Sequence, residues 1–131
     1  MKYNLTLLTL LFLSSALVAC KGSKRASFTA EQVEKMSSAD LVKARHQARV
    51  EGLKIIIAND GNCDAMAEEV KKYAESIQPM VEAAQKITFK EIKKIREGFD
   101  DSELEKLAKK AQPIGMKCEG NDKLEAALDE L

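Results

Sequence analysis

The sequence has little proline, little glycine and no tryptophan. Its 131 residues include two prolines and six glycines, and aromatic residues make up only 5% of the chain. This scarcity excludes collagen-like, low-complexity and broadly disordered proteins, because those classes are rich in proline or glycine. No segment alternates polar and apolar residues over a useful length, so we expect no β-sheet. What is present, 45% hydrophobic and 32% charged residues, indicates one compact helical domain.

The chain also lacks net charge and known catalytic motifs. Its 21 basic residues balance 21 acidic ones, so no overall field attracts nucleic acid, and we expect no nucleic-acid partner. There is no glycine-rich phosphate loop, no G-x-S-x-G nucleophile turn and no H-E-x-x-H zinc motif. We therefore expect a protein that is not an enzyme, with an enzyme that lacks a recognisable motif as the alternative.

The first twenty residues have the layout of a secretory signal. Lys2 supplies the positive start, and an apolar run extends from Leu5 to Ala19. A run of about fifteen residues is shorter than the roughly twenty that a helix needs to cross a bilayer. A removable signal is therefore favoured over a permanent transmembrane anchor.

The apolar run ends in Leu17-Val18-Ala19-Cys20, which resembles the lipobox of bacterial lipoproteins. In that family a diacylglycerol is joined to the cysteine thiol and the signal is cut immediately before it. The resemblance implies lipidation at Cys20, and it divides the chain into a removed signal peptide, a lipidated polar tether and a single helical domain, at residues 1–19, 20–28 and 29–131. The alternative is ordinary cleavage nearby, with Cys20 as a bystander.

The residue after the lipobox cysteine bears on the location of the protein. In such lipoproteins an aspartate there tends to retain the protein at the inner membrane, but this chain has Lys21. The resemblance therefore implies lipid attachment to the outer membrane, facing the periplasm or exposed at the cell surface. Basic residues of the tether could also contact anionic headgroups, or serve only as a soluble linker.

If the lipid occupies Cys20, Cys63 and Cys118 remain as a pair. Outside the cytoplasm such a pair is normally a disulfide, although a metal site and free thiols are alternatives. Closing this loop would stabilise the domain by on the order of 4 kcal/mol in the chain-entropy model. Neither cysteine belongs to a C-x-x-C motif, which argues against thiol redox catalysis and covalent haem attachment.

Local patterns mark the start of each predicted helix. The spacing of a capping box flanked by hydrophobic residues occurs four times, beginning at Thr29, Ser37, Thr88 and Asp100. Two further starts follow the glycine-containing turns at Gly61 and Gly120. The predicted helices cover residues 30–36, 38–58, 63–87, 89–98, 102–117 and 122–130.

Two of these helices carry an apolar seam at steps of three and four residues. The seam of the third helix consists of Met66, Val70, Tyr73, Ile77, Met80, Ala84 and Ile87. That of the fifth consists of Leu104, Leu107, Ala111, Ile114 and Cys118. Pro79 and Pro113 interrupt them, and we expect a kink at Pro79 if the helix is continuous. Because Cys63 opens the third helix and Cys118 closes the fifth, the disulfide predicts that these two helices lie antiparallel and side by side. The expected fold is all-α, a small antiparallel bundle of four to six helices stapled by one disulfide.

His46 is the only histidine and the main candidate ligand residue. It lies in phase with the apolar residues Val42 and Val50, so it faces or borders the core. The simplest interpretation is a partly buried histidine with satisfied hydrogen bonds. The alternative is a haem or metal ligand, for which a methionine would supply the second axial donor; the candidates are Met36, Met66, Met80 and Met116. We predict no metal site and no cofactor other than the lipid.

Asp60, Asn62 and Asp64 match the first three ligands of a calcium loop. The match then fails, because Ala65 stands where glycine is needed and Lys71 where a bidentate glutamate belongs. These three residues are better explained as signals that end one helix and begin the next.

The charged residues are unevenly distributed. A basic run at Lys86, Lys90, Lys93, Lys94 and Arg96 is followed at once by an acidic run at Glu97, Asp100, Asp101, Glu103 and Glu105. Such a region is usually a solvated face, and it could also dock a partner.

Taken together, the sequence predicts a lipid-anchored envelope protein that binds another macromolecule, with a protein of unknown identity as the expected partner. The alternative is a carrier of a small molecule, haem or metal within the bundle.

Overall fold

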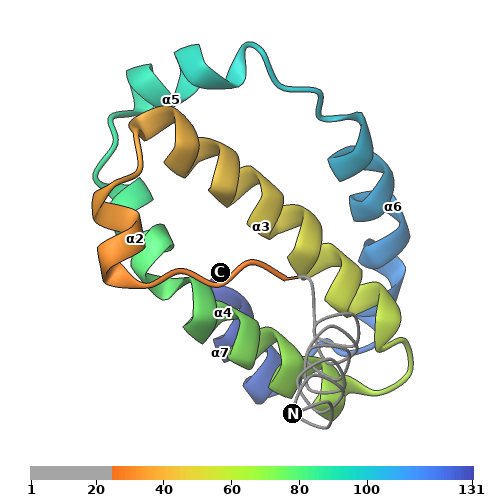
Figure 1. Cartoon of the computed structure of the whole chain (residues 1–131). Coiled ribbons are helices and arrows are strands. Elements are labelled where there is room, and N and C mark those ends of the chain that lie inside the picture. The colour runs from red at the N-terminus through yellow and green to blue at the C-terminus, as the bar shows by residue number, and fades with distance from the viewer. Residues whose placement is uncertain (1–24) are drawn as a thin grey trace, which may run out of the picture.

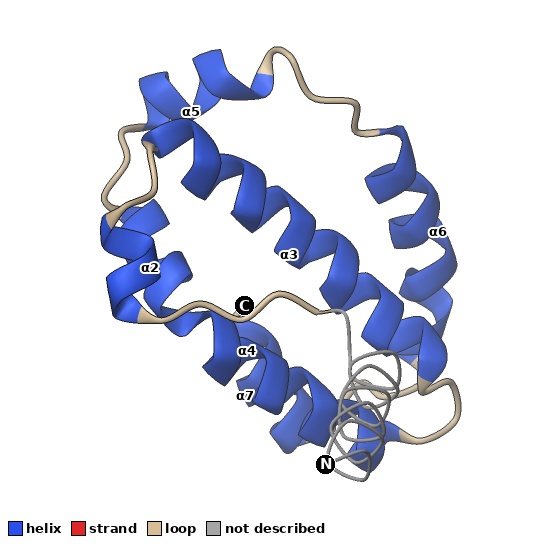
Figure 2. Ribbon diagram, in the orientation of Figure 1, coloured by secondary structure: helices blue, strands red, loops and turns tan. Residues whose placement is uncertain are grey.

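The computed structural model describes residues 25–131, and all regular secondary structure within that range is helical (Figure 2). Its six helices are α2 (Ala30–Glu34), α3 (Ser38–Ala58), α4 (Cys63–Gln85), α5 (Phe89–Arg96), α6 (Ser102–Met116) and α7 (Asp122–Asp129). The predicted all-α fold with one disulfide is confirmed. The predicted signal peptide, Cys20 and Lys21 lie outside the described residues.

The helices begin where the capping patterns predict. Thr29 and Ser37 form full capping boxes, and the Thr88 hydroxyl accepts a hydrogen bond from the Glu91 amide at 3.3 Å. The fourth pattern differs, because Asp101 rather than Asp100 is the N-cap residue of α6 and its side chain makes no capping bond. Asp100 instead accepts a hydrogen bond from the Ser102 amide at 3.0 Å. The glycines that end two segments, Gly61 and Gly120, have φ values of +83° and +85°, which glycine adopts without steric cost.

The long helix α3 is the centre of the arrangement (Figure 1). It packs against α4 on one side and α6 on the other, and α5 lies against it as well. Helix α4 also contacts α7 extensively and is contacted by α2. The result is a bundle in which α3 and α4 form the shared wall and the shorter helices cover it.

The predicted pairing of the two disulfide-linked helices is wrong. Cys63 and Cys118 are bonded, with their Cα atoms 5.5 Å apart, but α4 and α6 do not pack along their lengths; α6 packs on α3 instead. In Figure 1 the two helices lie on opposite sides of α3. The disulfide joins only their ends, because the turn that separates α3 from α4 brings the first residue of α4 close to the chain that follows α6.

The core follows the predicted seam of α4. Met66, Val70, Ile77 and Met80 are completely shielded from solvent, and Tyr73 is 5% exposed. The α6 seam is less buried, since Ala111, Ile114 and Cys118 are buried but Leu104 and Leu107 are only half-buried. Both Pro79 and Pro113 lie inside continuous helices.

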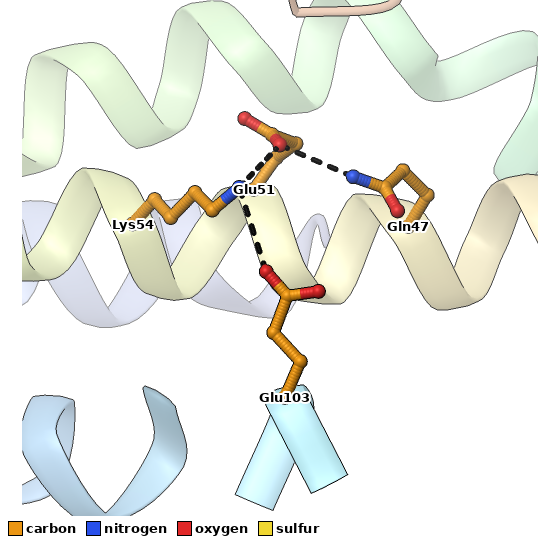
Figure 3. A network of polar contacts seen from close by, with 4 residues as sticks. All are labelled: Gln47, Glu51, Lys54 and Glu103. Carbon is orange, nitrogen blue, oxygen red and sulfur yellow. Dashed lines mark hydrogen bonds and ion pairs between the residues drawn. The ribbon is translucent and has the colours of Figure 1, made fainter. Parts of the chain in front are cut away.

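A polar network connects the start of α6 to α3. Lys54 lies 3.3 Å from a Glu51 oxygen and 3.8 Å from a Glu103 oxygen, and Gln47 donates to Glu51 at 3.2 Å (Figure 3). Exposed ion pairs of this kind stabilise a protein by at most about 1 kcal/mol. Their main effect here is structural: Glu103, which belongs to the acidic run, connects the start of α6 to α3.

The part of the predicted tether that the structure describes lies against α4. Arg25 pairs with Glu69 at 3.4 Å, and the Phe28 amide donates to the Ser76 carbonyl at 2.9 Å. Phe28 is half-buried against the core. No helix between residues 25 and 131 combines the length and the hydrophobicity needed to cross a membrane.

Candidate functional site

A partly enclosed pocket of about 200 Å³ lies between α3, the last turn of α4 and α5. The residues that line it are Val42, Arg45, His46, Arg49, Ala84, Gln85, Ile92 and Arg96. Three of these eight are arginines and one is a histidine, whereas none carries a carboxylate. The pocket is therefore a cationic site with apolar walls.

Helical spacing explains why these residues share one pocket. On α3, Arg45 and Arg49 are four residues apart and His46 is adjacent, so all three lie on the same side over one turn. On α5, Ile92 and Arg96 have the same four-residue spacing. The short connection from α4 to α5 ends at Thr88, which caps α5 and directs it onto α3.

Two of the arginines have no acidic partner among the described residues. Within residues 25–131 neither Arg45 nor Arg49 forms an ion pair. Burial lowers the pKa of Arg45, and the positive charge of Arg49 lowers it further. The Nη1 atom of Arg45 is buried and has no hydrogen-bond partner. Buried polar atoms normally have a hydrogen-bond partner, so a bound anion that accepted from Arg45 Nη1 would complete this arrangement.

The third arginine and the histidine share one carboxylate at the edge of the pocket. Asp101 Oδ1 lies 3.5 Å from His46 Nδ1, and Asp101 Oδ2 lies 3.5 Å from Arg96 Nη2. The His46 ring packs edge-on against Phe99, with 5.1 Å between ring centroids. His46 Nδ1 and Asp101 Oδ1 are both buried and neither has a hydrogen-bond partner. Their separation of 3.5 Å is too long for a well-formed hydrogen bond, although it allows an ion pair with a protonated imidazole.

The chemistry of the pocket suits binding. Guanidinium groups present several N–H donors in a fixed planar fork, which matches the oxygens of phosphate and carboxylate groups. Among the lining residues no hydroxyl or thiol stands beside His46 to act as a nucleophile, and the Asp101 carboxylate beside it lies at the pocket edge, where it also pairs with Arg96. The arrangement can hold an anionic group and place apolar atoms against Val42, Ala84 and Ile92.

Of the candidate ligand residues named from the sequence, His46 lies in this pocket, and Arg96 of the basic run lines it as well. The His46 side chain is 18% exposed, in agreement with the prediction that it borders the core, but its hydrogen bonding is not satisfied in the way predicted. Met66 and Met80 are fully buried core residues of α4, and Met116 is 63% exposed. Met36 is half-buried and lines a shallow hollow with His46 and Phe99.

The residues that resemble a calcium loop are used to join helices. Asp60 pairs with Lys117 at 3.3 Å, and Asn62 caps α4 by accepting from the Ala65 amide at 3.1 Å. Asp64 accepts a hydrogen bond from the Asn121 side chain at 3.3 Å. The described residues contain no cluster of three or more histidine, cysteine or acidic side chains that could hold a metal ion.

Arg45 and Arg49 are the functional candidates that sequence reasoning missed. The available signal was local. Arg45 and Arg49 lie four residues apart on either side of His46, and no acidic residue stands three or four positions from Arg45 to neutralise their charge. The contribution of α5 could not be inferred in this way, because it depends on how the chain returns to α3.

Comparison of the chain with known protein families, with curated proteins and with solved structures finds no match.

Proposed function

We propose that the protein is a lipid-anchored, non-enzymatic binding module of the bacterial envelope, and that its pocket binds an anionic group carried by another molecule. The half-buried Arg45, whose buried Nη1 atom has no hydrogen-bond partner and which stands beside Arg49, is the observation that supports binding. The Leu17–Cys20 lipobox resemblance supports the anchor, and Lys21 after it supports the outer membrane. A small module held at a membrane is useful for binding without catalytic residues.

The charge of the pocket favours a doubly charged group. Arg96 already shares Asp101 with His46, whereas Arg45 and Arg49 are not neutralised. A single carboxylate would compensate one of these two guanidinium groups, but a phosphate monoester or a pair of carboxylates would compensate both. We therefore propose a phosphate-like dianion as the group recognised.

The size of the pocket bears on the nature of the ligand. Its volume of about 200 Å³ is below the range of roughly 300–1,000 Å³ that drug-sized ligands occupy. It suits one anionic group with a few apolar atoms, presented by a larger partner or by a small metabolite, better than it suits haem. Binding to a macromolecule stays the leading proposal, and carriage of a small anion is the second.

Calorimetric titration of the exported protein with inorganic phosphate and with phenyl phosphate tests the proposed site. Acetate at equal ionic strength serves as the monoanion control. We expect Arg45→Gln and Arg49→Gln each to weaken phosphate binding by roughly 10- to 100-fold, since a hydrogen bond to a charged group contributes about 1.5–3 kcal/mol. Lys43→Gln, which removes an exposed charge from the same helix outside the pocket, is the matched control.

Two results would contradict the proposed site. One is the absence of phosphate binding, or binding no tighter than that of acetate. The other is an equal loss of affinity in Lys43→Gln and in the two arginine variants, because that would mean attraction by general charge rather than by the pocket.

A further inference from the structure

The outer face of α5 combines lysines with an exposed aromatic ring. Phe89 is 81% exposed, the most exposed large hydrophobic side chain among residues 25–131. Lys90, Lys93 and Lys94 are exposed as well, and none of the residues of this helix is buried. At 100° per residue Phe89 and these three lysines span about 140° of the helix. The lysines lie opposite the half-buried Ile92 and Ile95, and Phe89 lies at the border, about 60° from Ile92.

The described part of the chain leaves this face without a partner. Helix α5 packs on α3, at the edge of the bundle in Figure 1. No ion pair within residues 25–131 involves Lys90, Lys93 or Lys94. Two members of the acidic run point elsewhere, because Asp101 contacts His46 and Arg96 and Glu103 contacts Lys54. Glu97 lies four residues after Lys93 at the end of the same helix and offsets part of the lysine charge, which leaves the face with a net positive charge.

The chemistry of the face fits an anionic lipid surface. Lysines near a membrane are attracted to anionic headgroups, and an aromatic ring among them can enter the boundary between headgroups and acyl chains. An acidic protein surface would compensate the lysines, but it would need a separate apolar patch for the phenylalanine ring, whereas an anionic bilayer offers both the charge and the apolar boundary along its whole surface. Nucleic acid is disfavoured by the zero net charge of the chain.

The proposed anchor places a bilayer within reach. Arg25 is held on α4 by Glu69, and the five residues from Cys20 to Lys24 extend over less than about 20 Å at 3.3–3.6 Å per residue. A lipid on Cys20 would therefore keep the domain close to the membrane, where a weak second contact fixes its orientation.

We propose that the outer face of α5, formed by Phe89, Lys90, Lys93 and Lys94, docks the domain on the anionic lipid surface of the membrane to which it is anchored. This inference rests on the proposed lipid anchor. It adds a second, electrostatic contact that turns the α5 side of the bundle toward the bilayer.

The absence of tryptophan makes a direct test possible. Phe89→Trp keeps an aromatic ring on the face and introduces a single fluorescent reporter. We expect the fluorescence of the full lipidated protein to shift to the blue and to be quenched by brominated acyl chains in vesicles that contain phosphatidylglycerol. In vesicles of phosphatidylcholine alone we expect neither effect.

Matched variants separate the α5 face from general charge. In the Phe89→Trp background, we expect Lys90→Glu, Lys93→Glu and Lys94→Glu together to abolish the quenching. The same change of net charge on α6, Lys106→Glu with Lys109→Glu and Lys110→Glu, should leave it intact. A reporter at the exposed Met116 of α6, Met116→Trp, should stay unquenched.

The outcomes distinguish this proposal from the anchor. Protein that floats with both kinds of vesicle but is not quenched at position 89 overturns the docking face and leaves the anchor standing; the face would then be open to an acidic protein. Equal quenching at positions 89 and 116, or equal loss in the α5 and α6 charge variants, also overturns it. Protein that fails to float with neutral vesicles shows instead that the anchor is absent.

Discussion

At the scale of single residues, Arg45 stands out because the fold gives it less stabilisation than its charge requires. Burial and the neighbouring Arg49 both disfavour its charged form, and its Nη1 atom has no hydrogen-bond partner. Protein sites that bind ions often have this property, since the ligand supplies what the protein alone does not.

The first prediction concerns the cost of this arrangement. We expect Arg45→Gln to raise the free energy of unfolding of the ligand-free protein by about 0.2–0.5 kcal/mol, because it removes a like-charge pair at i and i+4. Urea unfolding measures this difference, with Lys43→Gln as the control that should change little. A loss of more than about 1 kcal/mol would mean that Arg45 stabilises the fold through its packing, and that its charge is not the dominant effect.

The second prediction concerns Tyr73. Burial and the nearby charge of Glu51 raise the pKa of Tyr73 to about 12, although Arg25 opposes the shift. An unfolded tyrosine has a pKa near 10, so the folded protein holds the phenolic proton more tightly. The resulting stability is present below pH 10 and is lost as the pH rises through about 12.

We expect this effect to reach about 1–3 kcal/mol, at 1.4 kcal/mol per pKa unit. Denaturant unfolding between pH 9 and pH 12 measures it, and Tyr73→Phe should remove that part of the pH dependence. The chain has one other tyrosine, Tyr3, in the predicted signal. The ultraviolet absorbance of the phenolate in the processed protein therefore reports Tyr73 alone, and a normal pKa in that titration would refute the prediction.

Sequence reasoning worked at this scale where a repeated pattern carried the information. The buried residues of α4 follow from spacing alone, because one face of a long helix must be covered. The pocket did not follow, since Arg45 and Arg49 belong to no repeating pattern and Arg96 comes from a distant part of the chain. The capping residues could be predicted because a cap, like the α4 seam, depends on residues close together in the sequence. At the start of α6 two adjacent acids, Asp100 and Asp101, both fit the pattern, so the spacing did not decide which one is the N-cap.

At the scale of helices, the disulfide connects elements that do not pack together. Cys63 begins α4 and Cys118 follows α6, yet each of these helices packs on α3. The bond therefore fixes one end of α6 to the bundle, while the other end is held by surface contacts such as the pair between Lys54 and Glu103. The sequence identified the bond but not the neighbours of α6, because a link between helix ends does not determine the direction in which each helix leaves.

The third prediction follows from this placement. We expect reduction of the disulfide to lower the free energy of unfolding by about 2–5 kcal/mol, in line with the loss of a native disulfide from a small secreted domain. Urea unfolding with and without reductant measures the loss. The double variant Cys63→Ser with Cys118→Ser should match the reduced protein and should not respond to reductant. Equal midpoints for oxidised and reduced protein would show that the bond contributes nothing.

At the scale of the whole molecule, the proposed role depends on Cys20, which lies outside the described residues. The fourth prediction is that Cys20→Ser abolishes incorporation of labelled fatty acid and the processed, membrane-bound form. Fractionation of the cell envelope measures both. Lys21→Asp is the matched control: it should keep the lipid but move the protein toward the inner membrane. Unchanged processing and membrane association in Cys20→Ser would refute lipidation.

The bond between Cys63 and Cys118 also closes a covalent ring. The ring spans a sequence separation of 55 residues and contains α4, α5 and α6. The chain between α5 and α6 includes the exposed Gly98 and Asp100, and exposed segments of small and polar residues are preferred sites of proteolytic nicking. A single cut there opens the ring without dividing the molecule, so the nicked protein keeps its mass, apart from one added water, until a reductant separates the two fragments.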